Sequence, residues 1–371
     1  MNPIRLRGPA DILAALPYQL GYHPGNAVVV VTLSNRAVGL VQRLDLPPVD
    51  HVSEAVAALL PALTREEADA VLLVGYESTA GESLPALDAL ADACTGLGLD
   101  VVDRLVVRGE RWFAPDCDGG CCPAEGTPMT EPADVPVVAE FVALEMAPVA
   151  DRDALTRQLQ PDEGRCEEVD VALTRAAAEA RRSAAAEGRR PRRATALTLV
   201  DGRAQTVRRL RWLAGWASVC DVAGDLREAG ADVGADEVAA LAVSLRDIAL
   251  RDGVIAWLCP GTLPLDSLDP DLLDQLRTSL PRPTWASSPP TSASVIAGRR
   301  MQARLVQLCR MLPAREAAPM LTVLANFAWC LGDGALARAA LERALAAEPG
   351  YRLAGLLERM VELAIRPRAS A

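Results

Sequence analysis

The pattern of apolar and polar positions divides the chain into two parts. Up to about residue 150, short apolar runs typical of strands alternate with helical periodicity. Strands are predicted at 26–33, 37–46, 70–76, 101–107 and 111–114. Helices are predicted at 11–20, 51–63 and 82–97. Strands alternating with helices predict an α/β fold, a mixed sheet with packed helices, for residues 1–150.

From about residue 151 the periodicity becomes helical, so residues 151–371 are expected to form a mainly helical domain. Helical patterns occur at 167–186, 203–220, 236–259, 301–312, 319–331, 335–347 and 351–365. The Pro- and Ser-rich segment 281–294 is linker-like. The pattern at 319–349 predicts a tetratricopeptide-like hairpin, because Ala337, Leu341, Ala344 and Pro349 fit the second helix of such a repeat. Only one copy is recognisable, which favours a packed helical domain over a peptide-binding solenoid.

Composition excludes several classes of chemistry. All 38 basic residues are Arg, so a P-loop lysine and a Schiff-base lysine are excluded. With only His23 and His51, sites that need several histidines are excluded as well. No GxSxG, HExxH or EF-hand pattern is present in the sequence.

Charge is uneven along the chain, whose formal net charge is −11. Residues 1–150 hold 8 Arg against 21 acidic residues, whereas residues 151–371 hold 30 Arg against 28 acidic residues. The acidic first part is expected to repel nucleic acid and anionic membranes. The first 21 residues lack a signal-peptide pattern and no long apolar run follows, so we expect a cytoplasmic protein without membrane association.

A Pro- and Gly-rich loop at 115–136 carries the strongest chemical signal, the thiols Cys117, Cys121 and Cys122. Three thiolates on one turn could bind a soft metal, zinc first. Three ligands do not close a structural zinc site, so a fourth would come from a second subunit or from one of Cys94, Cys166, Asp116 and Asp118. Cys94 lies on an apolar helical stripe and is expected in the core. A redox pair within the loop and simple packing of the thiols are the alternatives.

A second candidate is a polar binding site formed by His23, Arg43 and Asp45. Arg43 and Asp45 share one face of a predicted strand, and His23 lies in the preceding GYHPG turn. Such a set can bind a polar ligand or perform acid–base chemistry. The competing interpretation is an Arg43–Asp45 ion pair with His23 as a turn residue bonded to the backbone.

The third candidate is the Arg-rich segment 175–211, which holds eleven Arg against three acidic residues. Such a segment could contact phosphates of a nucleic acid. No aromatic residue precedes Trp212 for base stacking, and the segment could equally dock on the acidic part of the chain. Nucleic acid is therefore not the partner that we expect.

The opening LRGPADILAALPYQLGYHPGNAVVVV, followed by VQRLDLP, resembles the domain-of-unknown-function family 4192 of actinobacterial proteins. The CxxxCCPxxG segment from Cys117, LRDIALRDGVIAWL at 245–258 and the segment from FAWCLGDG onward are similar to the same family. The resemblance implies an uncharacterised cytosolic protein and brings no activity, cofactor or catalytic residue with it.

These observations favour a non-enzymatic scaffold or regulatory adaptor that acts through protein–protein contacts. Missing catalytic motifs, segregated charge and a repeat-like helical hairpin support this hypothesis. The alternative is a metal- or thiol-dependent enzyme or redox sensor centred on Cys117, Cys121 and Cys122. Nucleic-acid binding through 175–211 is the third hypothesis.

Overall fold

The computed structural model describes residues 8–35, 37–66, 68–117, 120, 122–186, 202–222 and 233–365. The chain splits into two compact units. Met1–Ala154 with Leu363–Ile365 form the first, here called the α/β unit. Leu155–Glu362 with Arg366–Ala371 form the second, the helical unit.

The α/β unit is built on a six-stranded sheet in the order β2-β1-β3-β4-β5-β6. Its strands are β1 Ala27–Ser34, β2 Ala37–Asp45, β3 Ala70–Tyr76, β4 Asp100–Arg108, β5 Arg111–Phe113 and β6 Thr127–Pro128. β3 and β4 are parallel and the other pairs are antiparallel. The predicted mixed sheet is therefore confirmed. The β-branched run of β1 occupies the centre of the sheet, where both faces are covered and Val28–Val31 are almost fully buried.

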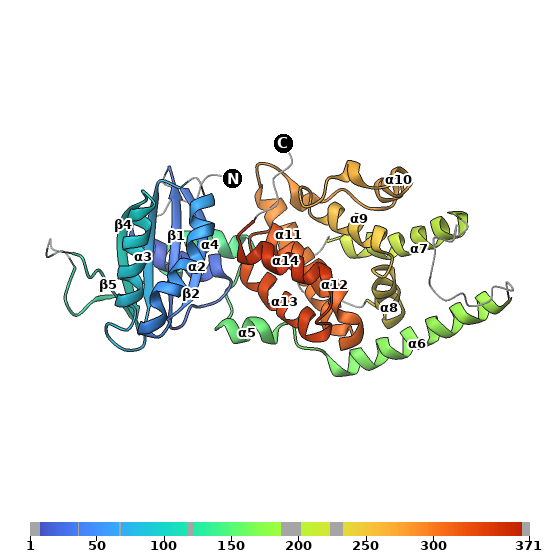
Figure 1. Cartoon of the computed structure of the whole chain (residues 1–371), viewed down its shortest axis with the longest axis horizontal. Coiled ribbons are helices and arrows are strands. Elements are labelled where there is room, and N and C mark those ends of the chain that lie inside the picture. The colour runs from blue at the N-terminus through green and yellow to red at the C-terminus, as the bar shows by residue number, and fades with distance from the viewer. Residues whose placement is uncertain are drawn as a thin grey trace. The chain divides into compact units, whose positions relative to one another are not determined.

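Helices cover both faces of this sheet (Figure 1). On one face, α2 (Val52–Arg65) and α3 (Leu84–Gly96) pack against Val28, Val30 and Leu73. On the other, α1 (Pro9–Leu20) packs against Val29, Val31 and Val74, and α4 (Pro136–Ala143) packs beside α1. The alternation of apolar side chains along each strand supplies both cores.

The predicted loop at 115–136 contains short regular elements. β6 extends the sheet beside β5, and a 3-10 turn forms at Pro132–Asp134. Gly126 precedes β6 with φ +80°, and a Cβ atom there would come within 2.6 Å of the Phe113 ring. Only glycine fits this close approach, which secures the end of the loop.

Among its described residues, the helical unit contains α5 (whose first residues belong to the α/β unit) and nine longer helices (Figure 1). They are α5 Arg152–Arg157, α6 Glu163–Ala186, α7 Gly202–Cys220, α8 Ala235–Ser244, α9 Ile248–Leu258, α10 Pro270–Ser279, α11 Ser292–Met311, α12 Ala314–Cys330, α13 Gly334–Ala347 and α14 Arg352–Glu362. The predicted α/β region followed by a mainly helical region is confirmed.

The helical pattern at 236–259 forms two helices, α8 and α9, with a break between them. Asp247 causes the break by accepting a hydrogen bond from the Leu250 N–H at 3.3 Å as the N-cap of α9. Its carboxylate also accepts two hydrogen bonds from Arg209 on α7, at 2.8 and 2.9 Å. This half-buried pair is a contact between residues far apart in sequence, which helical periodicity does not reveal.

The Pro- and Ser-rich segment 281–294 lies within the helical unit. Trp285 is buried there, and its indole N–H donates to the Leu258 carbonyl at 2.8 Å. A capping box formed by Thr291 and Ser294 then begins α11. Composition predicts a linker-like segment, whereas in the structure the segment packs over the end of α9 through Trp285.

The last four helices bury the stripes that periodicity predicts. Met301, Leu305 and Leu308 of α11 are fully buried. α12 and α13 form a hairpin that packs along its length, with Asp333 capping α13 through the Leu336 N–H at 3.0 Å. No helix within the described residues is long and apolar enough to cross a membrane.

Candidate functional site

The structure places Arg43 and Asp45 together at the end of β2. The Arg43 Nη2 atom lies 2.6 Å from Asp45 Oδ1, and the guanidinium stacks over the Tyr22 ring with its carbon 5.8 Å from the ring centroid. Arg152 also pairs with Asp45, at 3.3 Å. The Asp45 side chain is exposed, so this ion-pair cluster contributes little stability.

His23 is exposed in the turn before β1, and its backbone N–H donates to the Val149 carbonyl at 3.0 Å. Within the described residues, no hydrogen bond or ion pair joins its imidazole to Arg43 or Asp45. The structure thus brings two of the three predicted residues together and ties the third to the backbone. A ligand-binding role for His23, Arg43 and Asp45 stays a prediction.

The cysteine loop is described only in part, because Cys121 lies outside the described residues. Cys117 and Cys122 are half-buried. Two of the four proposed fourth ligands are engaged elsewhere: Cys94 of α3 is buried in the core, as predicted, and Asp116 is bound by Arg104. Asp118 lies outside the described residues. Among the described residues, no group of three or more His, Cys, Asp or Glu is arranged to bind a metal. Zinc binding and redox pairing at Cys117, Cys121 and Cys122 remain predictions.

Two arginines of the Arg-rich segment 175–211 are engaged inside the helical unit. Arg209 binds Asp247, and Arg175 pairs with Asp236 at the start of α8. Residues 187–201, which hold the RRPRR run, lie outside the described residues. The described part of the segment therefore directs some of its charge toward its own unit.

A buried carboxylate that sequence analysis missed lies where β3 ends. The Glu77 side chain is only 1% exposed and is surrounded by donors. It accepts hydrogen bonds from the Ser83 N–H at 2.9 Å, the Ser83 hydroxyl at 2.7 Å and the Gly81 N–H at 3.1 Å. Arg108, at the end of β4, pairs with it at 2.9 Å. We call these four residues the Glu77 cluster.

Burial alone would raise the pKa of Glu77, but the hydrogen bonds from Ser83 and Gly81 and the charge of Arg108 together lower it. The cluster connects the carboxyl ends of two parallel strands to the loop before α3, at the edge where α/β proteins often bind ligands. Because all of its partners belong to the protein, this carboxylate has a structural role. Its signal in the sequence is a glutamate directly after a buried strand, followed by Gly81 and Ser83.

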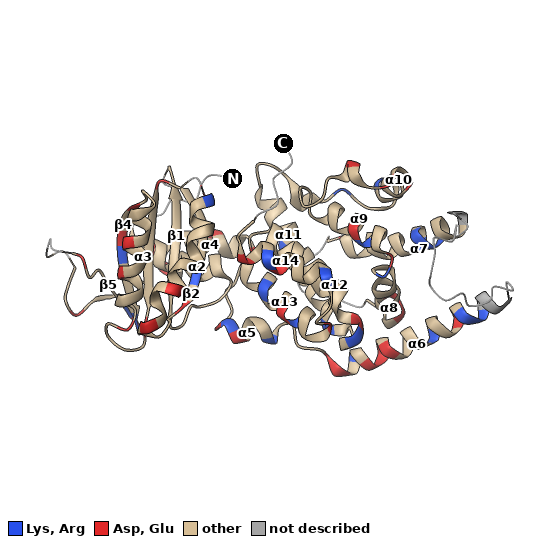
Figure 2. Cartoon of the chain, viewed as in Figure 1, with Lys and Arg blue, Asp and Glu red and all other residues tan. Residues whose placement is uncertain are grey.

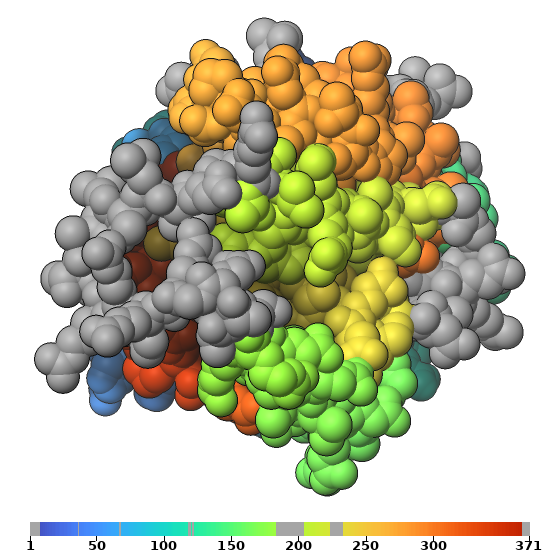
Figure 3. Space-filling view, turned by 90° about the vertical axis from the view of Figure 1, so that its right-hand side faces the viewer, coloured from blue at the N-terminus to red at the C-terminus, as the bar shows by residue number. Residues whose placement is uncertain are grey.

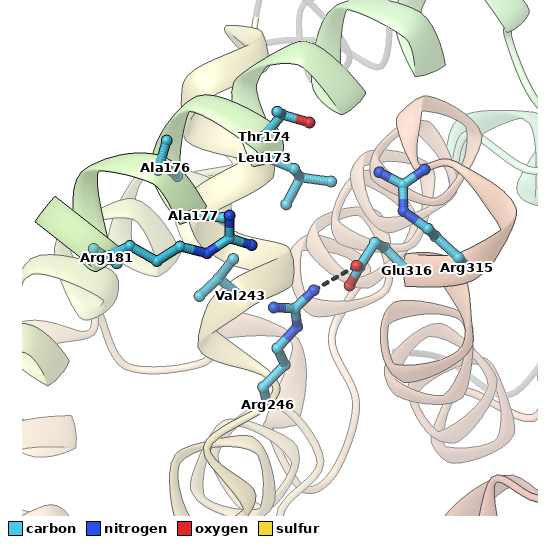
Figure 4. A pocket seen from close by; sticks show the side chains of 11 residues that line it. Leu173, Thr174, Ala176, Ala177, Arg181, Val243, Arg246, Arg315 and Glu316 are labelled. Atoms are coloured by element: carbon cyan, nitrogen blue, oxygen red, sulfur yellow. Dashed lines mark hydrogen bonds and ion pairs between the residues drawn. The ribbon is translucent and has the colours of Figure 1, made fainter. Parts of the chain in front are cut away.

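A groove in the helical unit has the geometry of a binding site (Figure 4). It has a volume of about 600 Å3, within the range of ligand sites. It lies between α6, the end of α8 and the start of α12. We call it the α6 groove, and its lining residues are Leu173, Thr174, Ala176, Ala177, Ala178, Ala180, Arg181, Val243, Arg246, Arg315 and Glu316.

The floor of the α6 groove is hollow because α6 presents alanines there. Leu173 and Val243 provide apolar contacts, while Ala176, Ala177 and Ala180 of α6 stay exposed. Alanine also has the highest helix propensity, so α6 keeps its helical form with little packing along this part. Figure 1 shows α6 extending past the helices that it packs against.

Three arginines surround the groove. Arg246 pairs with Glu316, as the dashed line in Figure 4 shows, and Arg315 pairs with Asp170 of α6. Arg181 forms no ion pair or hydrogen bond with any residue that the structure describes. In Figure 2 the acidic residues of α6 gather at its start and the arginines toward its end. The lining therefore carries excess positive charge on a chain whose net charge is negative.

A larger depression of about 1050 Å3 lies where α7, α10 and α11 meet, and it is lined by many hydroxyl groups. In Figure 3, α7 (yellow-green) separates α6 (green) from the orange residues that follow α9. The hydroxyls there serve their own helices: Thr278 donates to Asp274, and Thr291 and Ser294 form the capping box of α11. The α6 groove is therefore the better candidate, since Arg181 in its lining has no ion-pair partner among the described residues.

The fold and this groove define a protein of two units, one α/β and one helical, with a candidate binding surface in the helical unit. The chain belongs to the family described as Domain of unknown function (DUF4192), whose model matches residues 9–264 and 292–368. The unmatched interval contains α10 and the segment with Trp285. No solved structure matches the chain significantly.

Proposed function

We propose that this protein is a cytoplasmic adaptor that binds an acidic amphipathic helix of a partner protein in the α6 groove. The observation that carries the proposal is the alanine floor beside arginines at the rim. Alanines allow the backbone of a second helix to approach closely, since interaxial distance depends on the side chains at the contact. Apolar anchors of that helix would fill the space above Leu173 and Val243.

Charge complementarity selects an acidic partner. Of the four charged residues in the lining, three are arginines, and Glu316 is already paired with Arg246. Carboxylates along one edge of a bound helix would meet Arg181, with bidentate pairing favoured by the guanidinium geometry. Arg315 also lines the groove and is shared with Asp170 of α6. A basic helix would meet repulsion instead.

The same lining supports binding over catalysis. A guanidinium stays protonated near neutral pH and cannot act as a general base. Glu316 is the remaining ionisable group of the lining and is held by Arg246. The groups that line the groove are therefore suited to protein recognition. In this proposal the hairpin of α12 and α13 is a tetratricopeptide-like unit, and α13 supports α12 by packing against it.

The test is the binding of a fluorescent Leu/Glu amphipathic helix, about three heptads long, measured by anisotropy with the full chain. We expect Arg181→Glu to weaken binding about three- to tenfold, because it removes one attraction and adds a repulsion. Arg182→Glu is the matched control, since Arg182 lies on the same helix but outside the groove lining, and we expect it to bind nearly as the parent chain does.

Two results would oppose the proposal. Equal losses for Arg181→Glu and Arg182→Glu would assign binding to the general charge of α6. A Leu/Lys helix of the same length binding as tightly as the Leu/Glu helix would show that the groove does not select acidic partners.

A further inference from the structure

Two thiols meet at one end of the helical unit, away from the residues that line the α6 groove. Cys259 directly follows α9, and Cys330 is the last residue of α12. These two helices pack against each other. The side chains of Cys259 and Cys330 interact with each other, although the two residues lie 71 positions apart in sequence.

A tight turn secures this contact. The Thr262 N–H donates to the Cys259 carbonyl at 3.1 Å, which closes the turn after α9. The hydroxyl of Thr262 lies 3.4 Å from the Cys330 sulfur, within hydrogen-bond range for sulfur. The turn therefore positions both the second sulfur and a polar group beside Cys330.

The environments of the two sulfurs differ. Cys259 is 2% exposed, whereas Cys330 is half-buried. Hydrogen bonds from the Cys259 thiol and the Thr262 hydroxyl lower the pKa of Cys330 despite its burial. Burial raises the pKa of Cys259. A thiolate is the reactive form of cysteine, so the less buried of the two cysteines is also the one whose pKa is lowered.

We propose that Cys330 and Cys259 form a peroxide-reactive dithiol, a modification site in which Cys330 is the attacking thiol and Cys259 the resolving thiol. The Cys330 thiolate attacks one oxygen of hydrogen peroxide, so an S–O bond forms and the O–O bond breaks. The departing hydroxide takes the proton that Cys330 lost and leaves as water. Cys330 is then a sulfenic acid.

The second step closes a disulfide. The Cys259 sulfur attacks the Cys330 sulfur, so an S–S bond forms and the S–O bond breaks. The hydroxide that leaves takes the Cys259 proton and becomes a second water. Overall the two thiols lose two electrons and two protons, and one hydrogen peroxide is reduced to two waters.

Other thiols of the same unit provide internal comparisons. Burial raises the pKa of both Cys220 and Cys309 to about 12, which leaves them unreactive. Cys166 is half-buried like Cys330, but burial raises its pKa, and its thiol donates to the Arg310 carbonyl at 3.2 Å. Cys166 therefore matches Cys330 in exposure without the neighbouring thiol.

The experiment exposes the full chain to stepwise hydrogen peroxide, blocks remaining thiols with N-ethylmaleimide and maps peptides by mass spectrometry. We expect a Cys259–Cys330 disulfide to appear before Cys166 is oxidised. In Cys259→Ser, dimedone should label Cys330 as a sulfenic acid, and in Cys330→Ser, Cys259 should stay unmodified. In Thr262→Val the disulfide should still form, but loss of the Thr262 hydroxyl beside Cys330 should slow the reaction several-fold.

Circular dichroism of each variant separates a failure to fold from a loss of reactivity. Whether Cys259 and Cys330 form a disulfide is already decided by the parent chain. Oxidation of Cys166 while Cys259 and Cys330 both remain alkylated would overturn the proposal. So would a disulfide that joins Cys330 to a different cysteine.

Discussion

The Glu77 cluster and the α6 groove use charge in opposite ways. In the α/β unit, the Glu77 carboxylate is enclosed, and Ser83, Gly81 and Arg108 satisfy it. In the helical unit, the arginines of the groove are exposed at the rim, and Arg181 has no partner among the described residues. Buried charge that is fully satisfied holds elements together, whereas exposed and incompletely paired charge is available to a ligand.

The largest effect is expected from removing the enclosed carboxylate. Glu77→Ala leaves the Ser83 and Gly81 donors without their acceptor, so we expect the free energy of unfolding of the α/β unit to fall by about 3 kcal/mol. Hydrogen exchange of peptides covering β3 and β4 measures this loss without assuming that the two units unfold together. An unchanged exchange rate would show that Glu77 does not hold this edge of the sheet.

A smaller loss is expected where the same cluster packs against the sheet. A Cβ atom at Gly75 would lie 2.4 Å from the Ser83 hydroxyl oxygen and 3.0 Å from a methyl of Leu87. Gly75→Ala should therefore destabilise the α/β unit by about 1–3 kcal/mol through overpacking. The same exchange measurement applies, with Gly96→Ala as the control, because a Cβ atom there meets nothing within 4 Å.

Acid should weaken the Glu77 cluster. The pKa of Glu77 is lowered in the folded chain, so its contribution to stability is complete above its usual value of 4.5 and is lost as the pH falls toward the folded pKa. Protection of the β3 amides from hydrogen exchange, relative to the intrinsic rate at each pH, should fall below about pH 4.5 in the parent chain. Glu77→Gln should remove most of that dependence, and a variant with the same acid response as the parent chain would contradict this assignment.

The smallest effect on stability is expected in the groove itself. The Arg246 side chain in the Arg246–Glu316 pair is exposed, and Arg246→Ala should change the free energy of unfolding by less than about 1 kcal/mol. We predict that this loss of stability is much smaller than that of Glu77→Ala, because a side chain at the rim of a binding groove contributes little to the stability of the unbound chain. Thermal unfolding followed by circular dichroism measures it, and a loss as large as that of Glu77→Ala would remove the contrast.

Much of the fold was predictable because its signals are local. The β-branched run at Val28–Val31 marks a central strand, and the stripe of Met301, Leu305 and Leu308 marks a buried helix face. The break before α9 was missed because Asp247 also fits a helical surface position. Only its capping role and its pairing with Arg209 reveal the boundary.

The candidate sites were less predictable because they join distant segments. The α6 groove brings alanines near residue 177 beside Val243 and Arg315, and the dithiol brings Cys259 beside Cys330. An alanine-rich helix does not by itself indicate a groove, and a single cysteine in a segment does not indicate which other cysteine it will contact. By contrast, Arg43 and Asp45 were recognised as neighbours because alternation along one strand places them on the same face.

The most direct test of the adaptor proposal is to fill the α6 groove and measure binding of the Leu/Glu helix. Ala177→Trp places a large ring on the groove floor, whereas Val171→Trp places the same ring on an exposed part of α6 outside the lining. We predict that Ala177→Trp abolishes measurable binding and that Val171→Trp preserves it, with helix content unchanged in both. Full binding by Ala177→Trp would contradict the proposal that the α6 groove is the docking site.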